Sequence, residues 1–207
     1  MRKRLSLAAI RVFILFLFVF ALGKGSQFLI PIILSNLLDP TQYGIVEISM
    51  SAALIIVSVA SMGSSAFISR SIVKEESWIS LDAVKVYLVG LSAVLMLSSI
   101  FMHVIGSSVV TELVLAFSSV LLLQGAISSE LKSKAKRKSA IIVDCMLWGT
   151  LLSSGFIYIF EAVSELGDSL LWLASAHYAV LFVIFSKSID FVKIQTSVID
   201  SRYFKEG

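Results

Sequence analysis

The sequence predicts an all-α polytopic membrane protein with about six transmembrane helices. Of its 207 residues, 57% are hydrophobic and 15% are charged, and the mean hydropathy is +0.95, which is too apolar for a water-soluble domain. The charged residues gather in short clusters between long apolar runs, and about 20 apolar residues suffice to cross a hydrocarbon core. This clustering also argues against nucleic-acid binding, which a net charge of +3 could otherwise suggest.

The first apolar run covers about residues 7–38 and contains Arg11 and the sequence Gly23-Lys24-Gly25. It could form one long span or two short ones. The part after Lys24 would rise only about 20 Å as a helix, too little to cross a bilayer alone. One tilted, broken helix is therefore expected. A cleavable signal peptide ending near Gly23 is the alternative for this start.

A turn at Asp39-Pro40-Thr41 separates the first span from the second. Asp39 suits an N-cap, and Pro40 suits the first helical position, where its missing N–H has no partner to lose. The second span is expected at about residues 43–69, and a polar loop at residues 70–80 follows it.

The remaining four spans are expected at about residues 83–105, 109–131, 140–160 and 170–185. A short turn at residues 106–108, a basic segment at residues 132–138 and an acidic loop containing Glu161, Glu165 and Asp168 connect them in that order. The chain then divides into a transmembrane lobe, residues 1–186, and a cytoplasmic amphipathic tail or linker, residues 187–207.

The positions of Lys and Arg give the orientation. If six spans alternate, 16 of the 17 basic residues fall on the side that holds both termini, and only Lys24 remains. Because Lys and Arg are enriched on the cytoplasmic side, both termini are expected in the cytoplasm. The opposite loops carry acidic charges only: Asp39, Glu112, Glu161, Glu165 and Asp168.

Lys24 is the first candidate for a functional residue. It lies near the middle of the first span, where an unpaired ammonium costs about 2.5 to 3.5 kcal/mol on insertion scales, so such a residue usually faces a polar cavity. Gly23, Gly25 and Pro31 would let the helix bend there, and Gln27 extends the polar patch. The alternative is that Lys24 snorkels to the interface or pairs with a carboxylate in a closed bundle.

Three carboxylates have less specific interpretations. Asp144 lies at a different depth from Lys24, so a direct pair is not expected. Asp144 and Glu130 both lie near the basic segment, where an ion pair with Lys132 or Lys138 is expected rather than catalysis. Glu47 lies one or two turns into the second span, where it either lines the mouth of a cavity or sits at the membrane interface.

No catalytic, cofactor or metal site is expected. A single cysteine, Cys145, rules out an internal disulfide, and two histidines, His103 and His177, leave little for a metal site. The sequence has no phosphate-binding glycine loop and no His-Glu pair at helical spacing. Transport is therefore favoured over enzymatic activity.

Two stretches resemble bacterial polysaccharide flippases. Residues 34–44, LSNLLDPTQYG, are similar to the end of the first helix and the start of the second in that family. Residues 62–70, MGSSAFISR, are similar to the end of its second helix, which closes on an arginine. The resemblance covers about residues 15–160 and implies one lobe of a multidrug/oligosaccharidyl-lipid/polysaccharide exporter, in the O-antigen and exopolysaccharide branch.

The resemblance implies that the protein moves an undecaprenyl-pyrophosphate-linked sugar unit across the bacterial inner membrane. Transport would occur by alternating access between two helical lobes. Carried over by position, Lys24 would be a cavity cation and Arg70 a cation at the cytoplasmic mouth. Gln27 and Glu47 complete the expected substrate-binding set. The expected partners are the lipid-linked oligosaccharide and membrane lipids, with no nucleic acid.

Length is the departure from the family. Its members have twelve or more spans, so this chain is expected to be a truncated or half-size flippase. It would pair with itself as a homodimer or with a separate second lobe. A multidrug antiporter fragment and a non-transporting membrane assembly subunit are the alternatives. An antiporter is expected to bind cations through carboxylates, whereas a lysine as the deepest ionisable residue favours an anionic substrate.

Overall fold

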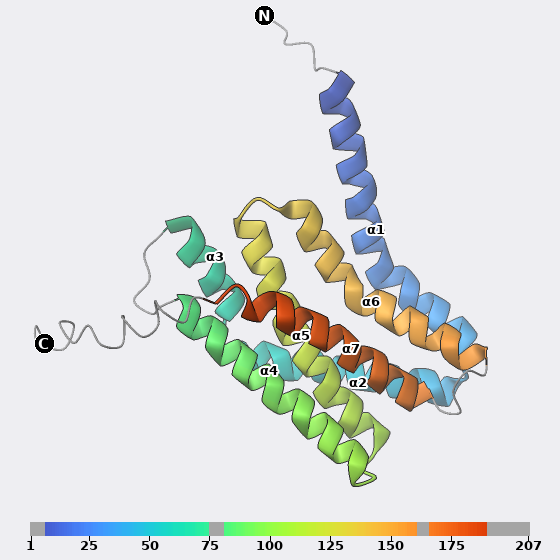
Figure 1. Cartoon of the computed structure of the whole chain (residues 1–207). Coiled ribbons are helices and arrows are strands. Elements are labelled where there is room, and N and C mark those ends of the chain that lie inside the picture. The colour runs from blue at the N-terminus through green and yellow to red at the C-terminus, as the bar shows by residue number, and fades with distance from the viewer. Residues whose placement is uncertain (1–6, 75–80, 161–165, 190–207) are drawn as a thin grey trace, which may run out of the picture.

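The computed structural model describes residues 7–74, 81–160 and 166–189, and these residues form seven helices and no strand (Figure 1). The helices are α1 (Leu7–Leu37), α2 (Pro40–Ala60), α3 (Ser64–Lys74), α4 (Leu81–Val104), α5 (Val109–Ser133), α6 (Arg137–Ile159) and α7 (Leu166–Ser186). Five of them, α2 and α4 to α7, are long and apolar enough to cross a membrane. The predicted all-α polytopic fold class is confirmed.

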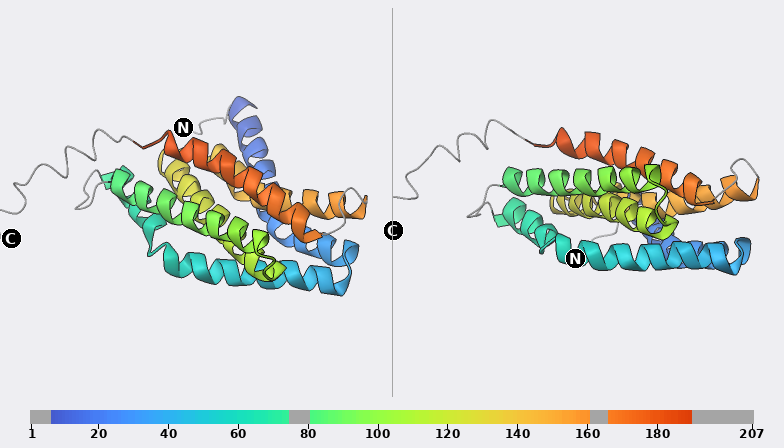
Figure 2. Two further views of the ribbon diagram at one scale, coloured as in Figure 1. Left: turned by 60° about the horizontal axis from the view of Figure 1, so that its bottom comes forward. Right: turned by 90° about the horizontal axis from the view of Figure 1, so that it is seen from below.

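Helix α1 occupies the predicted first span but is not broken. Its 31 residues are helical throughout, through Gly23 and Pro31, and the helix bends instead (Figure 1). A glycine inside a helix costs only about 1 kcal/mol, and a proline removes one backbone hydrogen bond and kinks the helix without having to end it. The C-terminal half packs on α6, while the N-terminal half leaves the bundle and exposes Phe13 and Phe18 (Figures 1 and 2).

The predicted second span, residues 43–69, is wrong as a single helix. It consists of α2 and α3, separated at Met62 and Gly63, whose φ angles are 45° and 74°. This left-handed backbone cannot continue a right-handed α-helix, so the chain changes direction there. The start of α2 is as predicted: Asp39 caps it by accepting hydrogen bonds from the N–H groups of Thr41 and Gln42, and Pro40 is the first helical residue.

Helix α5 forms the centre of the bundle. Helices α2, α3, α4, α6 and α7 all pack against it. Its apolar side chains are accordingly buried nearly all round, which is typical of a central helix. The fully buried ones include Leu113, Phe117, Val120 and Leu123.

Helix α7 begins four residues earlier than predicted. Asp168, predicted in the acidic loop, lies in its first turn, where a carboxylate interacts favourably with the positive end of the helix dipole. Arg70, predicted in a polar loop, lies in α3. Glu161 and Glu165 lie outside the described residues, as do the predicted surface tail beyond residue 189 and the first six residues.

The two ends of the bundle differ in charge. At the basic end, Lys85 at the start of α4 meets Glu130 at the end of α5 and Ser188 just after α7. The cations of this end include Lys85, Lys132, Lys134, Lys136, Arg137 and Lys138. At the acidic end, His103 of α4 meets Glu112 of α5, and Gly167 of α7 lies against Val109 of α5. The α1–α2 turn with Asp39 is at this same end (Figure 2).

Candidate functional site

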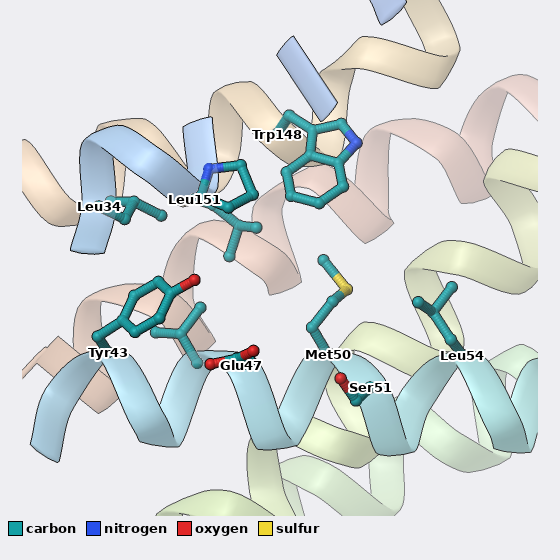
Figure 3. A pocket seen from close by; sticks show the side chains of 10 residues that line it. Leu34, Tyr43, Glu47, Met50, Ser51, Leu54, Trp148 and Leu151 are labelled. Carbon is teal, nitrogen blue, oxygen red and sulfur yellow. The ribbon is translucent and has the colours of Figure 1, made fainter. Parts of the chain in front are cut away.

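A pocket of about 220 Å³ lies between α1, α2 and α6 (Figure 3). Helix α2 forms its floor, while α1 and α6 form the opposite wall. The lining residues are Pro31 and Leu34 of α1, Tyr43, Val46, Glu47, Met50, Ser51 and Leu54 of α2, and Trp148 and Leu151 of α6.

Helix geometry explains why these residues meet. The cap at Asp39 and Pro40 turns the chain back after α1, so α2 starts beside the end of α1. Tyr43, Glu47, Met50 and Leu54 follow one another at three- or four-residue spacing, which places them on one face of α2. In Figure 3 the side chains of Tyr43 and Met50 rise from α2 toward Leu151 and Trp148, and the Glu47 carboxylate lies along α2 between them.

The chemistry of the pocket is that of a site for an amphipathic molecule. Its walls are mostly aliphatic and aromatic, and its polar groups are the Glu47 carboxylate, the Tyr43 hydroxyl and the Ser51 hydroxyl. Such a combination holds an apolar body and orients one polar group. Within the described part of the chain, Glu47 has no ion-pair partner, so its charge remains available to a ligand.

The four residues expected to bind substrate are not gathered in one place. Glu47 lines the pocket. Lys24 and Gln27 lie on α1, two turns and one turn before Pro31. Gln27 is half-buried, whereas the side chain of Lys24 lies outside the described part of the structure. Arg70 is exposed on α3, which contributes no residue to the pocket.

Trp148 is one of the pocket residues that the sequence did not point to. Nothing in the sequence distinguishes it from other aromatic residues of a membrane span, because its role depends on the packing of α6 against α1. The spacing of Tyr43, Glu47, Met50 and Leu54 was a usable signal, since it marks one face of α2.

One of the two expected ion pairs is confirmed. Lys132 binds Asp144 with an Nζ–Oδ2 distance of 2.9 Å. The expected partner of Glu130 was wrong, because this carboxylate binds Lys85 and Lys134. The physical reason is that α4 brings Lys85 into the bundle at the depth of Glu130, where the side chains of both residues are more than nine-tenths buried.

The chain matches no protein-family model, no curated protein and no solved structure at a significant level. The resemblance to polysaccharide flippases in residues 34–44 and 62–70 therefore stays a prediction.

Proposed function

We propose that this chain is one lobe of a transporter that moves a lipid-linked oligosaccharide across the bacterial inner membrane for polysaccharide biosynthesis. The observation that carries the proposal is the register of α1. Position 24 precedes Pro31 by seven residues, and Gln27 precedes Leu34 by seven, which is nearly two full turns. Because Pro31 and Leu34 line the pocket, positions 24 and 27 fall on the same face of α1.

The chemistry of this face suits an undecaprenyl-pyrophosphate-linked repeat unit. A lysine within a membrane helix is a functional-site candidate because its charge needs a partner at that depth. A pyrophosphate supplies two negatively charged groups for such a cation. The aliphatic and aromatic walls beside it suit the lipid tail.

The proposed transporter needs a second lobe, because the pocket has walls from one bundle only. The exposed apolar N-terminal half of α1 leaves room for a second copy or a separate chain beside it. In the proposed orientation the basic end faces the cytoplasm, as the positive-inside rule requires.

The test is complementation of a flippase-deficient bacterial strain with variants at position 24. Lys24→Gln and Lys24→Ala should abolish surface glycan while protein levels in the membrane stay normal, because the cation for the pyrophosphate is lost. Lys24→Arg should retain measurable function. Lys138→Gln, at an exposed residue of the basic end, is the matched control and should behave as wild type. Wild-type glycan output from Lys24→Gln would contradict the proposal.

Glu47 favours a second candidate, a multidrug antiporter of the same superfamily. Among the described residues Glu47 has no ion-pair partner. A carboxylate lining an apolar pocket suits a lipophilic cation, and Tyr43 and Trp148 supply aromatic faces for it. For an antiporter, Glu47→Gln should abolish resistance to lipophilic cations, whereas Lys24→Gln should not. If neither variant changes glycan output or drug resistance, a non-transporting assembly subunit becomes the better proposal.

A further inference from the structure

A second polar region lies away from the pocket, in the interior between α5, α6 and α7. His177 lies near the middle of α7 and is buried, with 6% of its surface exposed. Its Nδ1 is 3.2 Å from the hydroxyl oxygen of Thr150 on α6. An ionisable side chain at this depth in a membrane protein is a candidate functional group.

The hydrogen bonds of Thr150 fix which ring nitrogen of His177 carries the hydrogen. A threonine hydroxyl has one hydrogen to donate, and Thr150 donates it to the carbonyl oxygen of Met146 at 3.0 Å. The hydroxyl oxygen therefore accepts from His177, so Nδ1 carries the hydrogen in the neutral ring. Nε2 then has a free lone pair, and it is buried without a hydrogen-bond partner among the described residues.

Gln124 of α5 presents a second acceptor of the same kind. Its amide nitrogen donates to the carbonyl oxygen of Asp144 on α6 at 3.0 Å, and its Oε1 is buried with no donor in the described part of the protein. A buried acceptor without a donor is unfavourable. Whatever satisfies Gln124 and His177 must bring hydrogens, which water and protons do.

The charged groups on the helices around His177 belong to the two ends of the bundle. At the basic end, Lys85 of α4 pairs with Glu130 of α5, and Asp144 of α6 pairs with Lys132. At the acidic end, His103 of α4 pairs with Glu112 of α5. The remaining titratable groups described on α4 to α7 are Asp82, Tyr87, Lys134, Arg137, Lys138, Cys145, Tyr158, Asp168 and Tyr178.

Tyr178 is the titratable neighbour of His177 in sequence, and its hydroxyl lies 3.4 Å from the Ser92 hydroxyl of α4. Asp82 and Asp168 lie in the first turns of α4 and α7. His177 is therefore connected to α6 through the Thr150 hydroxyl, and neither of the two hydrogen bonds of that hydroxyl involves a charged group.

We propose that His177 is an intramembrane proton-binding site, which takes up a proton from the aqueous phase at Nε2. In the protonated ring both nitrogens are donors. Nδ1 keeps its bond to Thr150, whereas the new Nε2–H needs an acceptor that the present packing does not provide. Proton uptake is thereby coupled to hydration of this interior or to repacking of α7 against α5 and α6. The proposal does not depend on the transported substrate.

The test is nitrogen-15 NMR of the histidine rings in the full chain, reconstituted in lipid bilayers. The sequence has only two histidines, so His103→Gln leaves His177 as the single labelled ring. At neutral pH, Nδ1 should give a protonated and Nε2 an unprotonated nitrogen resonance. Between about pH 8 and about pH 3, a range that extends below the ordinary histidine window because the ring is buried, the unprotonated resonance should be lost as Nε2 gains its proton.

Two outcomes overturn the proposal. One is a neutral ring with the hydrogen on Nε2, and the other is an unprotonated Nε2 resonance that persists over the whole range. If His103→Gln does not fold, the same resonances are identified in the wild type as those lost in His177→Gln. Thr150→Val should abolish the preference for Nδ1–H, and Thr150→Ser, which keeps the hydroxyl, should retain it; a preference unchanged in Thr150→Val contradicts the assigned role of Thr150.

Discussion

Lys85 shows how this bundle tolerates a buried charge. Its Nζ lies 3.1 Å from Glu130 Oε2, 3.1 Å from the carbonyl oxygen of Ser188 and 3.2 Å from the hydroxyl of Ser188, so all three ammonium hydrogens have acceptors. The ammonium also lies over the ring of Phe185, 5.8 Å from its centroid. Lys85 thus joins the start of α4 to the ends of α5 and α7.

Lys85→Met should therefore lower the free energy of unfolding by on the order of 2 kcal/mol, the worth of a hydrogen bond to a charged group, because the buried Glu130 then keeps only its half-exposed partner Lys134. Thermal unfolding in detergent measures the loss. The double variant Lys85→Met/Glu130→Leu should be less destabilised than the single one, since it removes both buried charges. Lys138→Met, at an exposed lysine, is the control and should change stability by less than about 0.5 kcal/mol. Equal stability of Lys85→Met and wild type would contradict this role.

The contrast between two ion pairs shows what sequence reasoning can reach at this scale. Lys132 and Asp144 were predicted correctly, because they lie on either side of one short turn. The pair of Glu130 with Lys85 was missed, because Lys85 lies on α4 and Glu130 on α5, far apart in the sequence. Only the packing of α4 against α5 brings the two side chains together. Separation in sequence carries no information about which distant lysine a buried carboxylate meets.

At the scale of the helix, Gly155 sets how closely α1 approaches α6. A Cβ added at Gly155 would lie 2.7 Å from Cδ2 of Leu34, whereas one added at Gly149 on the same helix would meet nothing within 4 Å. Small residues at helix interfaces let two membrane helices pack closely. Leu34 also lines the pocket, so this contact positions one of its walls.

Gly155→Val should accordingly destabilise the protein by about 1 to 3 kcal/mol, the usual cost of overpacking an interior, whereas Gly149→Val should not. Both variants introduce the same β-branched residue on α6, so the difference between their unfolding midpoints isolates the contact with Leu34. Combining Gly155→Val with Leu34→Ala should recover part of the loss. Equal midpoints for the two valine variants would show that α1 is not held by this contact.

Hydropathy predicted most elements but not the break between α2 and α3. It identified the apolar runs that became α1, α4, α5, α6 and α7, with boundaries within a few residues. Residues 60–69 contain no proline and no charged residue, so the change of direction depends on the left-handed backbone of Met62 and Gly63. A glycine makes that conformation accessible, but a methionine gives no indication of it in the sequence. Residues 43–69 were therefore predicted as one helix.

For the whole molecule, the separation of charge between the two ends gives the proposed orientation a direct test. In a Cys145→Ser background, cysteines at the exposed positions Lys136 and Thr41 probe the basic and acidic ends. A membrane-impermeant maleimide should label Thr41→Cys in intact spheroplasts and Lys136→Cys only in inverted vesicles, because the basic end is proposed to face the cytoplasm. Labelling of both positions from the same side would contradict the topology.

The candidate site was less predictable than the membrane architecture. The charges of a loop indicate the side of the membrane on which it is expected, so the difference in charge between the two ends of the bundle could be predicted without knowledge of helix packing. The pocket arises where α1, α2 and α6 meet, and no local pattern relates Pro31, Glu47 and Trp148 to one another. Of the four expected substrate-binding residues, the structure therefore places Glu47 in the pocket and Arg70 on a helix that does not line it.

The central place of α5 has a consequence for biosynthesis. A membrane protein first inserts its helices separately and then associates them in the lipid. Helices α2, α3 and α4 each find their main partner in α5, which the ribosome supplies after all of them. During translation the earlier helices must therefore wait in the bilayer as loosely associated segments, and the bundle can assemble only once residues 109–133 have left the translocation channel.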